Sequence, residues 1–216
     1  MDERTLAAYD ADPQKYCRDW LGQRPPEEIH ISARRYFLTG GETADIGCGC
    51  GRDVDWLNRQ GWPCTGYEPS AGLRAEAQRL YPSYKFLAES LPLLAGIPVN
   101  RYDNVLCETV LMHLPGGEQA AALEALLRIL RPGGVLRLSW RAAKDGDTRD
   151  PAGRLYEPIH SAVIKARLEG EAAILLDGGS APCSSGATLH HIVARKGGLP
   201  AHKKSGVPFV ISPVRH

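Results

Sequence analysis

The sequence predicts an α/β fold in which a mostly parallel sheet carries helices on both faces. Short strand-like runs alternate with helix-like segments from Thr43 onward, which is the order of successive βαβ units. A glycine-rich loop, with Gly47, Gly49 and Gly51, directly follows the first strand-like run. Near the end of the chain two strand-like runs come in succession, which predicts a hairpin and at least one antiparallel strand.

Each element follows from the spacing of apolar residues and from the glycines and prolines between them. Leucines at 123, 126, 127 and 130 show the i, i+3, i+4, i+7 spacing of an amphipathic helix. Before residue 43 two helices are expected, over 3–22 and 26–38, separated by the RPP sequence. The other helices are expected at 52–60, 70–80, 117–130 and 155–168, and the strands at 43–46, 63–68, 84–88, 102–110, 135–140, 172–177 and 188–195.

Composition and charge are those of a soluble globular protein. Hydrophobic residues make up 43% of the 216 residues, charged residues 24%, and the formal net charge is +1. This balance favours neither nucleic acid nor an anionic membrane surface as the main partner. No apolar run approaches the roughly 20 residues of a membrane span. The N-terminal stretch is acidic and polar, unlike a signal peptide, so the expected location is the cytoplasm.

The cysteines indicate neither a disulfide framework nor a metal site. They are scattered, apart from one C-x-C pair between glycines: Cys17, Cys48, Cys50, Cys64, Cys107 and Cys183. Zinc sites usually contain C-x2-C pairs, often two of them. We therefore expect no metal ligands, and we interpret Cys48 and Cys50 as small side chains beside a crowded turn.

The glycine loop and two acids predict a nucleotide-like cofactor. In open parallel sheets ligands bind beyond the carboxyl ends of the strands, and Glu68 stands at such an end about 20 residues after the loop, where an acid suits ribose hydroxyls. A G-x-G-x-x-G dinucleotide fingerprint does not fit, since its third glycine would fall on Arg52 or Val54. Asp45 and Glu68 would also repel a pyrophosphate. S-adenosylmethionine carries a sulfonium, an ammonium and a ribose but no phosphate, so the charge pattern favours it.

Four motifs in order then resemble those of class I S-adenosylmethionine-dependent methyltransferases. They are ADIGCGCGRD, GYEPS, YDNVLCETVLMHLP and LRILRPGGVLRLSW, and the similarity extends over residues 5–196. The resemblance implies a Rossmann-like sheet of seven strands, the last of them antiparallel. It also implies an N-terminal helical lid at 1–38, a methyltransferase core at 39–196 and a tail at 197–216. The chain departs from the family pattern in its polar first strand, with Glu42 and Thr43.

The same resemblance assigns the site. It places Asp45 and the Gly47–Gly49 backbone at the methionine end of the cofactor, Glu68 at the ribose and Pro69 against the adenine. Glu89 and Ser90 would flank the adenine edge, and Cys107 with Glu108 would form the floor beneath the sulfonium. Tyr9 and Tyr16 match tyrosines of lid helices, with Tyr16 expected nearest to the methyl group. The complete set of expected cofactor-binding residues is Tyr16, Asp45, Gly47, Cys48, Gly49, Arg52, Asp53, Glu68, Pro69, Glu89, Ser90, Cys107 and Glu108.

His113 is the candidate catalytic base, because it follows the fourth strand on the cofactor side and its ordinary pKa is about 6.5. The alternative interpretation is a structural histidine bonded to loop backbone. As a strand-end acid facing an open cleft, Glu68 is expected to make few packing contacts.

The resulting function is methyl transfer to a small-molecule acceptor by in-line displacement. Alternatives are a partner subunit that binds the cofactor without chemistry, a methyltransferase acting on protein or RNA, and an NAD-dependent oxidoreductase, which the glycine spacing disfavours. An N-P-P-Y-type sequence after the fourth strand is missing, which argues against methylation of exocyclic base amines.

Overall fold

A seven-stranded sheet forms the centre of the computed structural model, which describes residues 1–141, 149–182 and 188–197. The strand order is β3-β2-β1-β4-β5-β7-β6. The strands are β1 (Thr43–Ile46), β2 (Cys64–Tyr67), β3 (Lys85–Leu87), β4 (Tyr102–Glu108), β5 (Leu130–Arg141), β6 (Ala172–Pro182) and β7 (Thr188–Lys196). The α-helices are α1 (Glu3–Ala11), α2 (Pro13–Leu21), α3 (Glu27–Tyr36), α4 (Arg52–Arg59), α5 (Ala71–Leu80), α6 (Gln119–Ile129) and α7 (Ser161–Leu168).

The pairing of the strands confirms the predicted topology. Strand β1 is parallel to both β2 and β4, β3 is parallel to β2, and β5 is parallel to β4. The last strand, β7, runs antiparallel to both β5 and β6. Because the sheet order reverses next to β1, the loops after β1 and β4 diverge there, and this is where such sheets bind ligands.

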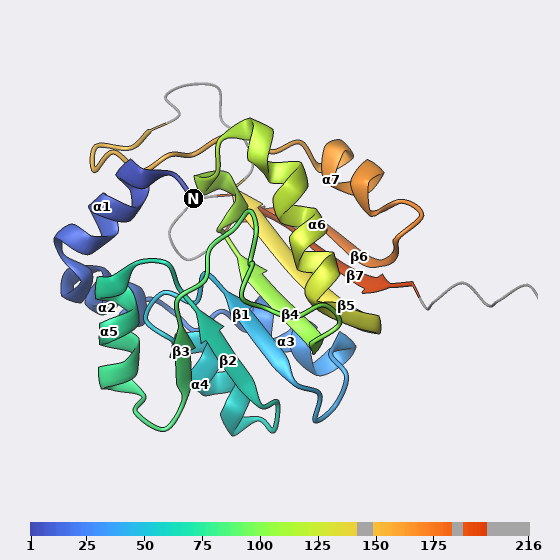
Figure 1. Ribbon diagram of the computed structural model, residues 1–216, viewed down its shortest axis with the longest axis horizontal. Helices are drawn as coiled ribbons and strands as arrows, with labels where there is room; N and C mark the ends of the chain where they lie inside the picture. The colour runs from blue at the N-terminus through green and yellow to red at the C-terminus, as the bar shows by residue number, and fades with distance from the viewer. Residues whose placement is uncertain (142–148, 183–187, 198–216) are drawn as a thin grey trace, which may run out of the picture.

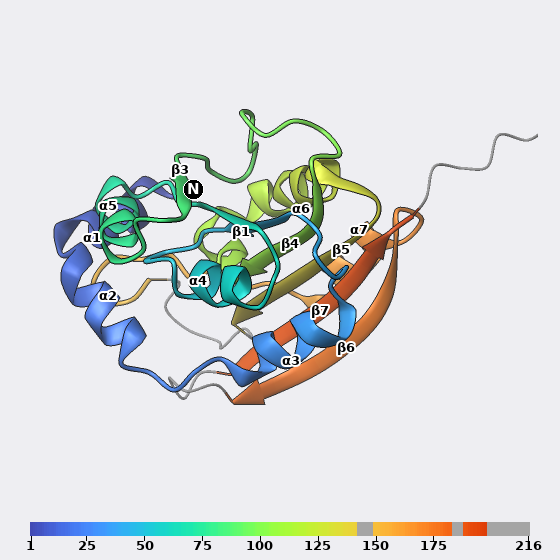
Figure 2. The same ribbon diagram turned by 90° about the horizontal axis from the view of Figure 1, so that it is seen from below.

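The helices cover both faces of the sheet, as expected. Helices α6 and α7 lie on one face, and α3 and α4 lie on the other (Figures 1 and 2). Each face has its own hydrophobic cluster: Leu126 and Ile164 belong to one, whereas Ala33 and Leu57 belong to the other. Helices α1 and α2 pack against α5, at the end of the sheet where the strands β1 and β2 finish (Figure 1).

Two expected helices differ from the observed ones. The helix expected over 3–22 is broken at Asp12, whose side chain accepts a hydrogen bond from the Lys15 amide and so caps α2, with Pro13 in its first turn. The helix expected over 155–168 begins only at Ser161. Pro158 explains the delay, because a proline disfavours the helical conformation of the residue before it.

The polar start of β1 is compensated by specific bonds. Thr43 is fully buried, and its hydroxyl donates to the Gly41 carbonyl (3.0 Å) and accepts from the Asn104 amide (3.2 Å). Glu42 pairs with Arg101 and Arg131 at the surface. The departure from an aliphatic strand therefore leaves no buried polar group of Thr43 unsatisfied.

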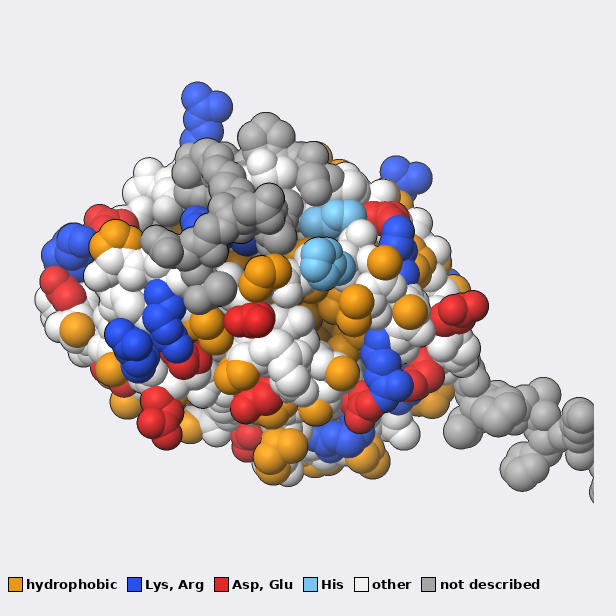
Figure 3. All heavy atoms as spheres, turned by 90° about the horizontal axis from the view of Figure 1, so that it is seen from above, with side chains coloured by type: hydrophobic (Ala, Val, Ile, Leu, Met, Phe, Trp, Pro, Cys, Tyr) orange, Lys and Arg blue, Asp and Glu red, His pale blue; other side chains and the backbone are white. Residues whose placement is uncertain are grey.

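Charged side chains of both signs are interleaved with hydrophobic ones on the face shown in Figure 3. This agrees with the net charge of +1 and differs from the basic stripe of a nucleic-acid-binding surface. Within the described ranges, no helix has the length and apolar character needed to cross a bilayer. The expected tail lies, from residue 198 onward, outside the described residues, as does Cys183.

Candidate functional site

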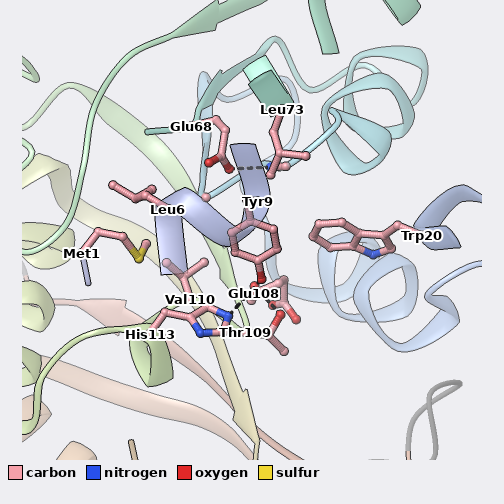
Figure 4. Close-up of a pocket in the computed structure, with 12 residues that line it drawn as sticks. Met1, Leu6, Tyr9, Trp20, Glu68, Leu73, Glu108, Thr109, Val110 and His113 are labelled. Atoms are coloured by element: carbon pink, nitrogen blue, oxygen red, sulfur yellow. Dashed lines mark hydrogen bonds between the residues drawn. The ribbon is translucent and has the colours of Figure 1, made fainter. Parts of the chain in front are cut away.

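A cavity of about 50 Å³ lies where α1 crosses the carboxyl ends of β1, β2 and β4 (Figure 4). Its lining combines residues of the N-terminal helices, the glycine loop and the loop after β4: Met1, Leu6, Tyr9, Trp20, Gly47, Gly49, Glu68, Leu73, Glu108, Thr109, Val110 and His113. Four of the sequence-predicted residues, Gly47, Gly49, Glu68 and Glu108, are thus brought together, with His113 among them.

The glycine loop is held in a conformation that larger residues would not adopt. Gly47 and Gly49 have φ angles of 75° and 54°. A Cβ atom on Gly47 would meet the Val110 side chain at 2.4 Å, and one on Gly49 would meet the Trp20 ring at 2.4 Å. The missing side chains therefore allow the N-terminal helices and the β4 loop to close directly onto the backbone after β1.

Glu68 is enclosed and bonded to backbone, contrary to the expectation of few contacts. Glu68 is only 6% exposed. Its carboxylate oxygens accept hydrogen bonds from the Gly49 amide and from the Ser70 amide, each at 2.9 Å. Burial nevertheless outweighs these two bonds and raises the pKa of Glu68 to about 7. The acid thus ties the end of β2 to the glycine loop.

Asp45, Arg52 and Asp53 form the charged surroundings of the loop. Asp45 is buried in β1, and burial followed by repulsion from Asp53 raises its pKa well above the ordinary range. Asp53 pairs with Arg52 at 3.1 Å, and the Arg52 guanidinium carbon lies 5.5 Å from the centre of the Trp20 ring. Trp20 of α2 is thereby held between the loop backbone and Arg52.

At the end of β4 the two expected floor residues point to different sides. Glu108 lines the cavity, and its carboxylate accepts bonds from Arg137 and from the Ser139 hydroxyl (2.7 Å). The Cys107 side chain belongs instead to the hydrophobic cluster beneath α6. Thr109, which follows, has a φ angle of 56°, a strained value for a β-branched residue beside the cavity.

His113 has a defined tautomer and a defined partner. Its Nδ1 lies 2.6 Å from the Leu155 carbonyl oxygen. A carbonyl can only accept, so Nδ1 carries the proton and Nε2 is left as the acceptor. The Tyr9 hydroxyl, 3.2 Å away, donates to it, and Figure 4 shows this bond closing one end of the cavity. Burial lowers the pKa of His113 to about 4, so the ring is neutral at physiological pH.

The other expected cofactor residues lie outside the cavity lining. The Glu89 carboxylate accepts from the Gly96 amide, and the Ser90 hydroxyl donates to the Leu91 carbonyl. Cys48 is buried in the cluster beneath α4, and Pro69 is half-buried. Tyr16 stands behind Tyr9, with ring centroids 5.1 Å apart. Tyr9 lines the cavity and Tyr16 does not, and the expectation that Tyr16 lies nearest to the methyl group stays a prediction.

Sequence reasoning missed Trp20, Val110 and Arg154. Trp20 follows Tyr16 by four residues on α2, so the two share one helix face, and this spacing was an available signal. Val110 is recognisable only through its contact with Gly47. Arg154 lies beside three tyrosine rings, and no local sequence pattern predicts these contacts.

Comparison with known proteins identifies the fold and its core. Residues 44–138 match the family described as "Methyltransferase domain". Among curated proteins, the ubiquinone biosynthesis O-methyltransferase of Psychrobacter arcticus is 32% identical over 116 residues, covering 51% of this chain and 44% of that protein. The enzyme of the same description from Alkalilimnicola ehrlichii is 28% identical over 146 residues, covering 62% and 58%. The chain thus spans about half the length of the curated relatives it matches.

A solved structure extends the likeness to almost the whole chain. The Burkholderia thailandensis 1,6-didemethyltoxoflavin-N1-methyltransferase, solved with bound 1,6-didemethyltoxoflavin and S-adenosylhomocysteine, superposes with a TM-score of 0.70. The superposition covers 90% of this chain and 88% of the Burkholderia chain, at 20% sequence identity. At that identity the likeness concerns the fold.

Proposed function

Because this chain belongs, through residues 44–138, to the class I S-adenosylmethionine-dependent methyltransferases, we propose that it methylates a small-molecule acceptor. Its cofactor, S-adenosylmethionine, supplies the methyl group: the acceptor's lone pair bonds to the methyl carbon while the carbon–sulfur bond breaks and its electron pair stays on sulfur. The observation that carries the proposal is the convergence of Glu68, the glycine loop and His113 on one cavity.

The residues at the Glu68 end of the cavity fit this cofactor. The glycine loop offers close approach to backbone, and Glu68 offers a buried carboxylate at the strand end where ribose hydroxyls are bound in this fold. We place the methionine end on Asp45 and the Gly47–Gly49 backbone, with Glu108 beneath the sulfonium. The further positions proposed for cofactor contact are Tyr16, Cys48, Arg52, Asp53, Pro69, Glu89, Ser90 and Cys107.

Residues 1–38 act as a lid in this proposal. A cavity of about 50 Å³ is far below the roughly 300–1,000 Å³ of ligand sites, and Tyr9 and Trp20 occupy the space beside the loop. We infer that α1 and α2 move apart from the glycine loop to admit the cofactor. Closure afterwards excludes water from the reacting groups. Residues 39–196 form the core on which this lid closes.

His113 orients the acceptor. With Nδ1 fixed on the Leu155 carbonyl, the Nε2 lone pair faces the cavity, where it now accepts from the Tyr9 hydroxyl. An acceptor hydroxyl that replaces the Tyr9 hydroxyl would be held in the same way. Since the pKa of His113 is lowered to about 4, the ring accepts a full proton only weakly, and it acts mainly by aligning the nucleophile.

A small acceptor is favoured over a macromolecule by the enclosure of the site. The cavity lies beneath α1, and Met1 packs against the core while its amino group donates to the Leu91 carbonyl (2.8 Å). A protein or RNA side group would have to pass these helices. The curated relatives are named for ubiquinone biosynthesis and the structural neighbour for 1,6-didemethyltoxoflavin, which are both small-molecule chemistry.

Binding and turnover are tested separately. Calorimetry should show binding of S-adenosylmethionine and S-adenosylhomocysteine and weaker or no binding of NAD, and tighter binding of NAD would overturn the cofactor assignment. Mass-spectrometric detection of S-adenosylhomocysteine with a library of small acceptors then tests transfer. Cofactor binding without product from any acceptor would favour a non-catalytic partner subunit.

A further inference from the structure

A cluster of three tyrosines and two arginines adjoins the cavity on the side of His113. The Arg154 guanidinium carbon lies 5.5 Å from the ring centre of Tyr9, 5.2 Å from that of Tyr16 and 5.7 Å from that of Tyr156. Arg141, at the end of β5, lies 4.6 Å from the Tyr156 ring centre. We call these five residues the arginine–tyrosine cluster.

The cluster is continuous with the proposed reaction site. The Tyr156 and His113 ring centroids are 5.1 Å apart, and the Tyr9 and His113 centroids are 5.9 Å apart. Tyr9 itself lines the cavity and lies between Glu68 and His113 in Figure 4. A molecule whose nucleophile reaches His113 would therefore extend toward Tyr156 and Arg141.

The cluster carries an excess of positive charge. The Arg154 Nε donates a hydrogen bond to the Asp150 carboxylate (2.7 Å), and a terminal guanidinium nitrogen of Arg154 pairs with the same carboxylate at 2.6 Å. Arg141 makes no ion pair with any residue in the described parts of the chain and is exposed. Among the residues that the structure describes, two guanidinium groups thus face one carboxylate, and the guanidinium without a carboxylate partner is that of Arg141.

The opposite end of the cavity is acidic. Asp45 and Glu68 stand beside the glycine loop, and both are buried. The cationic cofactor belongs at that end, so the groups around His113 are left for the acceptor. Arginine on an aromatic face presents its donors sideways, which suits a carboxylate.

We propose that the methyl acceptor is an anionic aromatic molecule whose carboxylate is bound by Arg141, with its ring beside His113 and Tyr156. The proposal rests on the proposed function and adds the chemical class of the acceptor. A cationic acceptor would instead need the space between the three tyrosine rings, and the Arg154 guanidinium already fills it.

Three catechols of different charge test this assignment: 3,4-dihydroxybenzoate, its near-isosteric neutral amide 3,4-dihydroxybenzamide, and the cationic dopamine. Their affinities are measured by calorimetry on the full chain saturated with S-adenosylhomocysteine. We expect the benzoate to bind at least about tenfold more tightly than the benzamide, as one charge-assisted contact provides. Arg141→Gln should abolish this preference, and Arg141→Lys should restore part of it. Arg59→Gln, on the remote helix α4, is the matched control and should leave all three affinities unchanged.

Equal affinities for the three probes, a preference for dopamine, or no measurable binding of the benzoate would overturn the proposal. An unchanged preference in Arg141→Gln would do so too. If Arg141→Gln weakens S-adenosylhomocysteine itself, the arginine binds the carboxylate of the cofactor, and the acceptor assignment is wrong. Failure of the wild type to bind S-adenosylhomocysteine would instead contradict the proposed function, so the two failures are distinct.

Discussion

Glu68→Gln should make the free protein more stable at pH 8. Glu68 is buried, and its pKa is raised from 4.5 to about 7, chiefly because burial disfavours the charged form. The folded state therefore prefers the protonated acid. The penalty for ionising it is absent below pH 4.5 and fully present above about pH 7. At about 1.4 kcal/mol for each pH unit between these values, it amounts to about 3 kcal/mol.

Glutamine has the shape of the protonated acid, so it should recover most of that energy. Its oxygen can accept from either the Gly49 or the Ser70 amide, while its NH2 group faces the other. This mismatch reduces the expected gain to about 1–3 kcal/mol. Urea unfolding followed by tryptophan fluorescence at pH 8 and pH 5.5 measures it, with exposed Glu169→Gln as the control. The gain should be smaller at pH 5.5, where wild-type Glu68 is largely protonated in the fold.

Loss of the Glu68 carboxylate should also weaken cofactor binding. If the carboxylate accepts both ribose hydroxyls, each charge-assisted bond contributes roughly 1.5–3 kcal/mol, and Glu68→Ala should lower affinity for S-adenosylhomocysteine at least about tenfold. Wild type should discriminate against 2′-deoxy cofactor, and Glu68→Ala should hardly do so. A Glu68→Gln protein that is less stable at pH 8, or equally shifted at both pH values, would refute the buried-charge argument. Equal discrimination by both proteins would refute the ribose contact.

Three further predictions concern the loop, the histidine and the lid. Gly49→Ala should lower stability by about 1–3 kcal/mol in urea unfolding, because its Cβ meets the Trp20 ring at 2.4 Å and its φ is positive; an unchanged midpoint would show that α2 shifts freely. His113→Ala should slow methyl transfer about 100-fold with little change in cofactor affinity, because the nucleophile loses its alignment, and an unchanged rate from pH 6 to 9 in a folded variant would leave His113 structural. Amide exchange in α1 and α2 should slow on addition of S-adenosylhomocysteine while α6 stays unchanged, and equal exchange with and without ligand would contradict a closing lid.

Residues 1–20 also support the core, so their deletion is a poorer test of the lid than amide exchange. Thr5 is fully buried, and its hydroxyl accepts from the Leu155 amide at 2.9 Å. Asp2 pairs with Arg149 at 2.9 Å. Deletion would leave the Leu155 amide without its acceptor and expose part of the core. Loss of activity in a truncated protein would therefore not distinguish a lid from a structural segment.

The fold was predictable because its signals are local. The period of the leucines in α6, the glycines after β1 and the paired runs of the C-terminal hairpin each lie within a few residues of one another. The misplaced boundaries also have local causes that could have been given more weight. Asp12 with Pro13 is a helix start inside the expected first helix, and Pro158 stands inside the expected last one.

The two ends of the cavity are encoded differently, and this explains which of them could be predicted. The proposed cofactor end is built within residues 43–68, so spacing alone brings Glu68 to the glycine loop. The proposed acceptor end joins Tyr9 to His113 across 104 positions and then reaches Arg154, contacts that no local pattern contains. The methyltransferase-domain match over 44–138 includes the cofactor end but neither Tyr9 nor Arg154. The domain match therefore informs the cofactor, and we expect variants of the segments outside it to change acceptor specificity.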